Sequence, residues 1–340
     1  MTSNPPDSVL VYVGFDRIGD GFLKLPFVRG LRAAFPGAQI TWLAGREDSV
    51  YAGVLADLAH GLIDEIIENA GIGLSFGELF QGLSKGPLGG RRFDLIIDTQ
   101  RIFWTSLSLK RVPHDAFISP AARFLLSSKK PAKGYRFPKT MQRQLLDMLE
   151  LASGRDFPTP QTLDFDLNKD LRAEAARLLP EGPEYIGLAP GSGGPPKCRP
   201  LENFIELAPH QESQGRVPVF FLGPKETGWI DEIRNALPEA RFPLQEEGVE
   251  RNHGFSPLLS VALSERVRAS VSNDSGAAHM FAVGGRPLVT LYGVTAPKKF
   301  MPMTGKLTIV RGQDFGGPEM RHIPLDAIKE ALEQAIESYP

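Results

Sequence analysis

Three glycine-rich loops each carry a charged side chain that could act on a ligand. The first loop, residues 14–26, places Asp20 between Gly19 and Gly21, just after an apolar run. A carboxylate in this position could remove a proton from a hydroxyl group. It could equally cap the helix that follows, because aspartate accepts hydrogen bonds from the N–H groups at a helix start. Taken alone, the residues favour the cap.

The second loop, residues 190–204, has the composition of a diphosphate site. It offers backbone N–H groups from its glycines, the hydroxyl of Ser192 and the point charge of Lys197. The GxxxxGK[ST] pattern of a Walker A loop is absent, and two consecutive prolines interrupt the run. Lys197 and Arg199 could instead be solvated charges that precede a helix, so both interpretations stay open.

The third loop, residues 272–285, follows another strand pattern. Asp274, Ser275 and Gly276 stand where that strand ends and a short helix begins. The N–H groups and partial positive charge of a helix start favour an anion such as a phosphate or a phosphosugar. His279 follows about one turn later and is expected to face the same end. Either an aspartate or a histidine alone is more often structural, but their joint placement favours a binding site.

Alternating strand and helix patterns must position these loops. The strand patterns are short and rich in β-branched residues, and they alternate with helical patterns such as those over 21–35 and 48–59, which predicts parallel sheets covered on both faces. The expected strands lie at 9–13, 39–44, 63–68, 94–98, 185–189, 217–223, 267–273 and 287–293.

The segment 154–166 divides the chain, because it contains two prolines and shows no helical periodicity. We therefore predict an amino-terminal domain over 1–160 and a carboxyl-terminal domain over 161–340. Both are expected to be α/β, Rossmann-like and doubly wound, and to face a cleft where loops after the strands bind ligands. The last helix, about 324–338, is a candidate to pack back onto the amino-terminal domain.

Composition excludes several classes of protein. The 340 residues carry 38 basic and 40 acidic side chains, a balance that indicates neither a nucleic-acid binder nor an acidic tail. Cys198 is the single cysteine and cannot form an internal disulfide, which fits a reducing, cytoplasmic compartment. Neither a signal peptide nor a run of about 18 apolar residues is present, so any membrane contact should be peripheral.

The region 91–143 is strongly basic, with 12 basic residues against three acidic ones. Such a run is commonly a solvated face, and no RNP, helix-turn-helix or zinc pattern accompanies it, so nucleic acid is not expected. A nicotinamide cofactor is also disfavoured, because GxGxxG and the acidic ribose contact are missing. A nicotinamide oxidoreductase and a sugar-nucleotide-binding protein without transferase activity are kept as alternatives.

Four stretches, in this order, resemble glycosyltransferase family 9, the ADP-heptose:lipopolysaccharide heptosyltransferases of Gram-negative bacteria. They are GDGFLKLPFVRGLRAAFPGAQITWLAG, FDLIIDTQ, PGSGGPPKCRPLENFIELA and SNDSGAAHMFAVGGRPLVTLYGVTAP. The resemblance implies a GT-B fold and an inverting transfer of a sugar, heptose from ADP-heptose, to a lipopolysaccharide-core or related surface-glycan acceptor. It also implies that the enzyme needs no metal and no cofactor beyond the nucleotide-sugar substrate.

The resemblance also implies roles for single residues. Asp20 matches the general base that deprotonates the acceptor hydroxyl, and Lys197 matches the lysine that neutralises the diphosphate. The family motif D-[TS]-G-x-x-H, which holds the donor phosphates and sugar, is matched by Asp274, Ser275, Gly276 and His279.

Two segments depart from the family pattern. The family commonly has R-x-S-x-x-G-D where this chain has GFDRIGD, which leaves the acceptor and the transferred sugar open. The family's acidic donor contact has its nearest candidate in Glu226. For the basic region, including Lys129, Lys130, Lys133 and Arg136, the resemblance favours binding of a phosphorylated glycolipid or of the inner face of the inner membrane.

Overall fold

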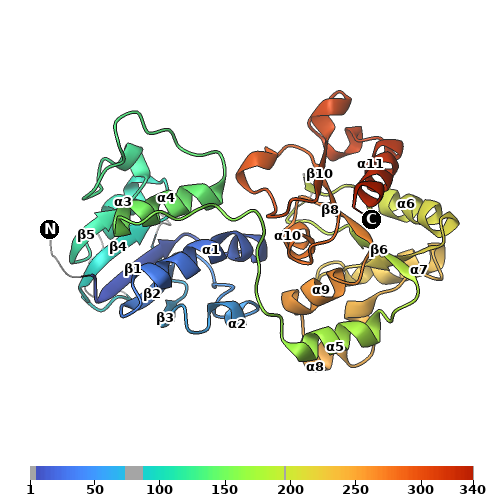
Figure 1. The fold of residues 1–340 in the computed structure, drawn as a ribbon, viewed down its shortest axis with the longest axis horizontal. Helices are drawn as coiled ribbons and strands as arrows, with labels where there is room; N and C mark the ends of the chain where they lie inside the picture. Colours follow the sequence, from blue (N-terminus) through green and yellow to red (C-terminus); the bar gives the residue numbers. More distant parts are fainter. Residues whose placement is uncertain (1–4, 73–86, 195–196, 340) are drawn as a thin grey trace. The chain divides into compact units, whose positions relative to one another are not determined.

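A computed structural model describes residues 5–72, 87–194 and 197–339 (Figure 1). The chain divides into two compact units, Met1–Thr159 and Pro160–Pro340, one residue away from the boundary expected at the linker. Each unit is a parallel sheet with helices packed on it, as the alternating patterns predict. Within the described residues, no helix is both long enough and apolar enough to cross a bilayer.

The first unit contains a five-stranded parallel sheet in the order β3-β2-β1-β4-β5. Residues 9–13 of the central strand are all buried, which is typical of a parallel strand covered on both faces. The strands are β1 (Ser8–Val13), β2 (Gln39–Ala44), β3 (Glu65–Ile67), β4 (Phe93–Asp98) and β5 (His114–Ile118).

Helix α1 begins earlier than the sequence suggested, so that Asp20 lies inside its first turn. It packs against α4, and a glycine makes this approach possible, since a Cβ at Gly30 would lie 2.8 Å from Leu149 Cδ2. The helices of this unit are α1 (Ile18–Ala34), α2 (Ala56–Ala59), α3 (Phe103–Leu109) and α4 (Met141–Ser153), with the short 3₁₀ helix η3 (Ala121–Phe124).

The expected helix over 48–59 is wrong for most of its length, because only α2 is helical there. The chain instead turns after Ser49, whose hydroxyl donates to Asp16 Oδ2 at 3.0 Å. The Ser49 N–H donates to Glu68 Oε1 at 2.7 Å. These bonds to distant side chains compete with helical bonds and hold the segment as a loop.

The second unit contains a five-stranded parallel sheet in the order β10-β9-β8-β6-β7. The sequence analysis did not identify β10, an edge strand whose residues are mostly half-buried and so lack a clear apolar run. The strands are β6 (Glu184–Ala189), β7 (Arg216–Phe220), β8 (Ala269–Asn273), β9 (Leu288–Tyr292) and β10 (Leu307–Arg311).

The last helix packs within its own unit. Its apolar face, including Ile328 and Leu332, joins a core with β8 and β9 and with Phe204 of α6. The further idea that this helix also packs on the amino-terminal domain stays a prediction. The helices here are α5 (Lys169–Leu178), α6 (Leu201–Ser213), α7 (Ile230–Ala236), α8 (Val249–His253), α9 (Pro257–Ser264), α10 (Gly276–Val283) and α11 (Leu325–Ser338).

Candidate functional site

Three loops of the second unit bring a lysine, an aspartate and a threonine together. Lys197 Nζ lies 2.8 Å from Asp274 Oδ2, and the Thr295 hydroxyl donates to the same oxygen at 2.6 Å. These residues follow β6, β8 and β9, which are neighbours in the sheet. About a third of the Lys197 side chain is exposed, whereas Asp274 is almost fully buried. The buried aspartate therefore fixes the position of the lysine ammonium, which stays accessible to solvent.

The start of α10 lies beside this cluster in the chain. Ser275 is the N-cap in an extended conformation, and within the described part of the chain its side chain makes no capping hydrogen bond. Its hydroxyl instead lies 3.5 Å from that of Ser272. Ser275 and Gly276 are half-buried, so the first N–H groups of α10 can reach a ligand.

His279, one turn into α10, is buried, and the charges of Lys197 and Asp274 both act on the pKa of its imidazole. Burial lowers the pKa of its imidazole to about 4, and Lys197 acts in the same direction while Asp274 opposes them. The ring is therefore neutral at physiological pH, and it can donate or accept a hydrogen bond without carrying charge.

Asn273, the last residue of β8, joins the loops of this site. Its Nδ2 donates to the Pro190 carbonyl at 2.6 Å, and its Oδ1 accepts from the Arg199 N–H at 3.3 Å. Arg199 itself is buried and donates to the carbonyls of Met320 and Ile323. The interpretation of Arg199 as a solvated charge is therefore wrong, because it anchors the loop that carries Lys197.

Glu226, in the loop that follows β7, packs closely against the loop that follows β6. A Cβ at Gly191 would come within 2.8 Å of Glu226 Cδ, and one at Gly223 within 2.7 Å of Oε2. Burial raises the pKa of this carboxyl, against an opposing backbone hydrogen bond at Gly223. Ser192 in the same loop exchanges hydrogen bonds with the backbone of Gly194, so its hydroxyl closes a local turn.

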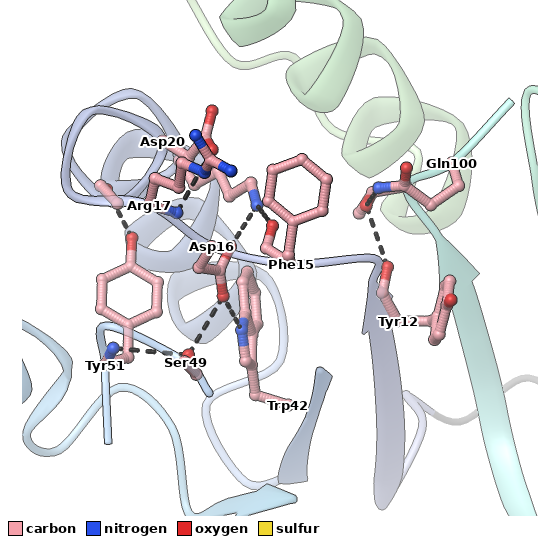
Figure 2. Close-up of polar contacts among 12 residues, drawn as sticks. Tyr12, Phe15, Asp16, Arg17, Asp20, Trp42, Ser49, Tyr51 and Gln100 are labelled. Carbon is pink, nitrogen blue, oxygen red and sulfur yellow. Dashed lines mark hydrogen bonds and ion pairs between the residues drawn. The ribbon is translucent and has the colours of Figure 1, made fainter. Parts of the chain in front are cut away.

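In the first unit, Asp20 is half-buried in the first turn of α1 (Figure 2). Asp20 is not the N-cap that the sequence favoured, because α1 begins at Ile18 and Arg17 takes that position. Its Oδ2 instead accepts a hydrogen bond from the Arg17 N–H at 3.2 Å, so it caps the helix from within the first turn. The cap and a catalytic role are compatible, because a carboxylate has two oxygens and several lone pairs.

Asp16, which the sequence analysis did not single out, forms the buried centre of the same loop. Its carboxylate pairs with the Lys24 ammonium and accepts from the Trp42 indole N–H at 2.8 Å. Figure 2 shows the same carboxylate facing the Trp42 indole and the Ser49 hydroxyl. Lys24 also donates to the Phe15 carbonyl at 3.2 Å. Both charges of this ion pair are out of solvent, so the pair fixes the backbone from which Asp20 projects.

The loop after β2, which carries Ser49, also contacts helix α1. The Tyr51 hydroxyl donates to the Gly21 carbonyl at 2.6 Å. Gly21 itself is enclosed, since a Cβ there would lie 2.6 Å from Leu55 Cδ1 and 2.8 Å from Val50 Cγ2. The glycine that follows Asp20 is therefore required by packing.

A family model for glycosyltransferase family 9 (heptosyltransferase) matches residues 84–323, which cover most of the chain and all of the Lys197 cluster. The chain belongs to glycosyltransferase family 9. It is therefore a glycosyltransferase, and the oxidoreductase alternative is set aside. Asp20 lies before the matched residues.

Similar proteins agree with this assignment. Lipopolysaccharide heptosyltransferase 2 of Salmonella typhimurium is 27% identical over 89% of this chain and 87% of its own length. Lipooligosaccharide heptosyltransferase 2 of Haemophilus influenzae is 38% identical, over 39% of this chain and 38% of its own.

Solved structures show the same fold. The glycosyl transferase family 9 structure from Veillonella parvula has a TM-score of 0.69 at 20% identity and covers 98% of this chain and 97% of its own. ADP-heptose lps heptosyltransferase II of E. coli has a TM-score of 0.67 at 23% identity, over 97% and 99% of the two chains. The family 9 enzyme described here therefore has the GT-B fold.

The basic region of this glycosyltransferase is less uniform than its sequence suggested. Lys130, Lys133 and Arg136 are exposed. Lys129 is exposed as well but donates to the Ala152 carbonyl at 2.9 Å. Arg143 pairs with Asp147 and Glu150 of its own helix α4 and is not part of a free basic face.

Proposed function

We propose that the protein transfers a heptose from ADP-heptose to a lipopolysaccharide-core acceptor with inversion at the anomeric carbon. The observation that carries the proposal is the cluster of Lys197, Asp274 and Thr295 beside the start of α10. A fixed ammonium next to the N–H groups of a helix start suits a diphosphate. The named relatives and the solved neighbours that are heptosyltransferases support the choice of donor and acceptor.

The reaction is a single displacement. The acceptor hydroxyl loses its proton to the Asp20 carboxylate, and its oxygen forms a bond to the anomeric carbon while the bond from that carbon to the diphosphate oxygen breaks. The electron pair of the broken bond leaves with ADP, and Lys197 stabilises the charge that develops there. Lys197 and the start of α10 supply this stabilisation, so we propose that transfer needs no metal ion.

The donor assignment rests on positive charge, which a matched pair of variants can test. Lys197→Ala should lower both ADP affinity and turnover on the order of tenfold or more, whereas Lys197→Arg keeps the charge and loses less. Equal loss in the two variants would contradict a role for the charge. Isothermal titration with ADP gives the affinities, and ADP release gives the turnover.

The acceptor is proposed to be a phosphorylated glycolipid at the inner face of the inner membrane, which makes the enzyme cytoplasmic. The exposed cations Lys130, Lys133 and Arg136 support this, because they suit phosphate groups. Reversing Lys130 and Lys133 to glutamate should raise the KM for the acceptor and leave ADP affinity unchanged. Lys169→Glu with Arg251→Glu, on the second unit, is the matched control.

The deciding assay is transfer itself. The protein is incubated with ADP-heptose and lipopolysaccharide from a heptose-deficient strain, with and without EDTA, and the anomeric configuration of the product is read by NMR. We expect inverted product in both conditions. If ADP-heptose is not consumed while another nucleotide sugar is, the donor assignment fails. A thermal-shift screen of ADP-, GDP-, UDP- and dTDP-sugars would then identify the donor, because a ligand at 100 times its Kd adds roughly 2.7 kcal/mol to the free energy of unfolding.

A further inference from the structure

Three large apolar side chains are exposed at one edge of the first unit. Ile102 and Trp104, which follow β4, are 42% and 47% exposed, and Leu125, which follows β5, is 61% exposed. Strands β4 and β5 are neighbours, and helix α3, which carries Trp104, lies beside η3. The three side chains therefore come from adjoining loops at the carboxyl ends of the strands.

The turn before Leu125 has an unfavourable backbone conformation. Ala122, Arg123 and Phe124 all lie in the left-handed region, with φ of 46°, 56° and 64°. Residues other than glycine rarely adopt this conformation, and it persists only where the surroundings enforce it. As a result Phe124 is buried while Arg123 and Leu125 on either side of it are exposed.

An aromatic cluster holds this turn and connects it to the loop after β4. The Phe124 ring is stacked on Phe137 with centroids 5.6 Å apart, and it meets Tyr135 edge-on at 5.7 Å. The guanidinium of Arg101 lies 4.0 Å from the centroid of the same Phe137 ring. Arg101 therefore stands next to Ile102 in the chain and contacts the cluster that supports Arg123 and Leu125.

Positive charge dominates the exposed part of this edge, because two acids of the basic region lie near the amino ends of β4 and β5 and the third, at the carboxyl end of β4, is buried. Asp94 accepts hydrogen bonds from Asp7 and Ser8, and Asp115 pairs with Arg92. Asp98 is buried against the hydroxyls of Ser106 and Ser119. Arg101 and Arg123 are exposed, so the surface combines exposed cations with exposed apolar side chains.

We propose that Ile102, Trp104, Leu125, Arg101 and Arg123 form a membrane-docking surface whose apolar side chains enter the interface of an anionic bilayer. Aromatic and aliphatic side chains with arginines beside them suit this environment, where the rings sit at headgroup level and the cations meet anionic lipid. The inference rests on the proposed function, because it explains how the enzyme would meet an acceptor that is itself a lipid.

The surface lies close to the loop that carries Asp20. A Cβ at Gly14 would lie 3.3 Å from the side chain of Gln100, the residue before Arg101. A sugar group that projects from a bilayer docked here would thus arrive at the same sheet edge as the proposed base.

Vesicle sedimentation tests the apolar part of the surface. The full chain is mixed with vesicles of phosphatidylethanolamine and phosphatidylglycerol, or of phosphatidylcholine alone, without donor or acceptor. We expect binding to the anionic vesicles, and Trp104→Ala with Leu125→Ser should weaken it by about tenfold or more. The control is Phe315→Ala, which removes an aromatic side chain of the second unit that is 38% exposed. Equal loss in control and variant would overturn the proposal.

The strained turn provides a second variant that should not unfold the protein. Arg123→Gly removes a cation and relieves the left-handed conformation, so vesicle binding should fall by several-fold while Tm stays level or rises. Ala122→Gly relieves the left-handed conformation of the preceding residue but keeps the cation, and should bind vesicles as the wild type does. If Arg123→Gly keeps full vesicle binding, the turn is not part of the docking surface.

Transfer assays separate this inference from the proposed function. With acceptor embedded in vesicles the Trp104 and Leu125 variant should lose most of its rate, and with a deacylated, soluble acceptor it should match the wild type. Equal rates of the variant and the wild type on embedded acceptor would overturn the docking surface. So would a wild type that forms a dimer through this surface, if the variant loses the dimer but keeps vesicle binding. Absence of transfer by the wild type with either acceptor, despite vesicle binding, would instead overturn the proposed function.

Discussion

Each unit contains a lysine–aspartate pair near the carboxyl end of its sheet, and the two pairs differ in burial. The Lys24 and Asp16 side chains are 4% and 0% exposed, whereas those of Lys197 and Asp274 are 34% and 9% exposed. The first pair is enclosed by further hydrogen bonds from Trp42 and to the Phe15 carbonyl. The enclosed pair therefore fixes the backbone around it, while the open pair holds a charge that a ligand can reach.

The largest effect on turnover is expected at Asp20, the proposed base, which lies next to the enclosed pair in the chain. Asp20→Asn should reduce turnover by on the order of 100- to 10,000-fold, because asparagine cannot take the proton. It should keep ADP affinity and Tm nearly unchanged, because its amide oxygen can still accept from the Arg17 N–H. Steady-state rates, ADP titration and thermal unfolding provide the three readings. A variant that keeps more than about a tenth of the rate would remove Asp20 as the base.

The same substitution in the two lysines tests the comparison itself. Lys24→Met leaves the Asp16 carboxylate buried without its cation and should cost about 3–5 kcal/mol of unfolding free energy. Lys197→Met should cost about 1 kcal/mol or less, because its pair is partly exposed. Urea unfolding of both variants measures the difference. Similar losses would show that burial does not distinguish the pairs.

The two units are also expected to respond to pH with opposite signs. Burial raises the pKa of Asp98 in the first unit to about 6, and burial lowers the pKa of His279 in the second to about 4. Asp98 therefore contributes stability at low pH that is lost as pH rises through 6. His279 contributes stability above its unfolded pKa of 6.5 that is lost as pH falls toward 4.

Variants of Asp98 and His279 allow the pH dependence of stability to be measured for each group separately. Between pH 4 and 6.5, the stability of the wild type relative to His279→Gln should rise with pH, by roughly 3 kcal/mol in total. Relative to Asp98→Asn, wild-type stability should fall with pH over an overlapping range. Urea unfolding at a series of pH values gives both slopes, and a flat difference for His279→Gln would mean that its imidazole is not buried in the neutral form.

The smallest effect is expected at Thr295, which acts through Asp274. Thr295→Val removes the hydroxyl that holds the Asp274 carboxylate and should raise the donor KM a few-fold, roughly the loss of one hydrogen bond to a charged group. Thr295→Ser keeps the hydroxyl and should restore the wild-type value. Failure of serine to rescue would mean that the threonine methyl group, and not its hydrogen bond, is what matters.

The sequence predicted the parallel sheets and the loops of the second unit because local patterns specify both. The run around Asp274 matches a motif, and its strand and helix adjoin it in the chain. Asp16 and Lys24 were missed because nothing local distinguishes a buried charge from a solvated one; their burial depends on Trp42 and Ser49, which lie far away in sequence. Thr295 lies in the last of the four stretches that resemble the family but outside its D-[TS]-G-x-x-H motif, so nothing in the sequence singled it out.

Two further features also depend on contacts that are distant in sequence. The amphipathic pattern of the last helix shows that one face is covered but not by what, so its packing on β8 and β9 could not be predicted. The segment around Ser49 has helix-forming residues, and only its bonds to Asp16 and Glu68 explain why it forms a loop.

A crystal structure with ADP bound tests the central claim that the open pair is the donor site. We expect a phosphate oxygen within hydrogen-bond distance, roughly 2.7–3.2 Å, of Lys197 Nζ and of the backbone N–H groups at Ser275 or Gly276. Phosphates that lie more than about 6 Å from both, well beyond any direct hydrogen bond, would contradict it.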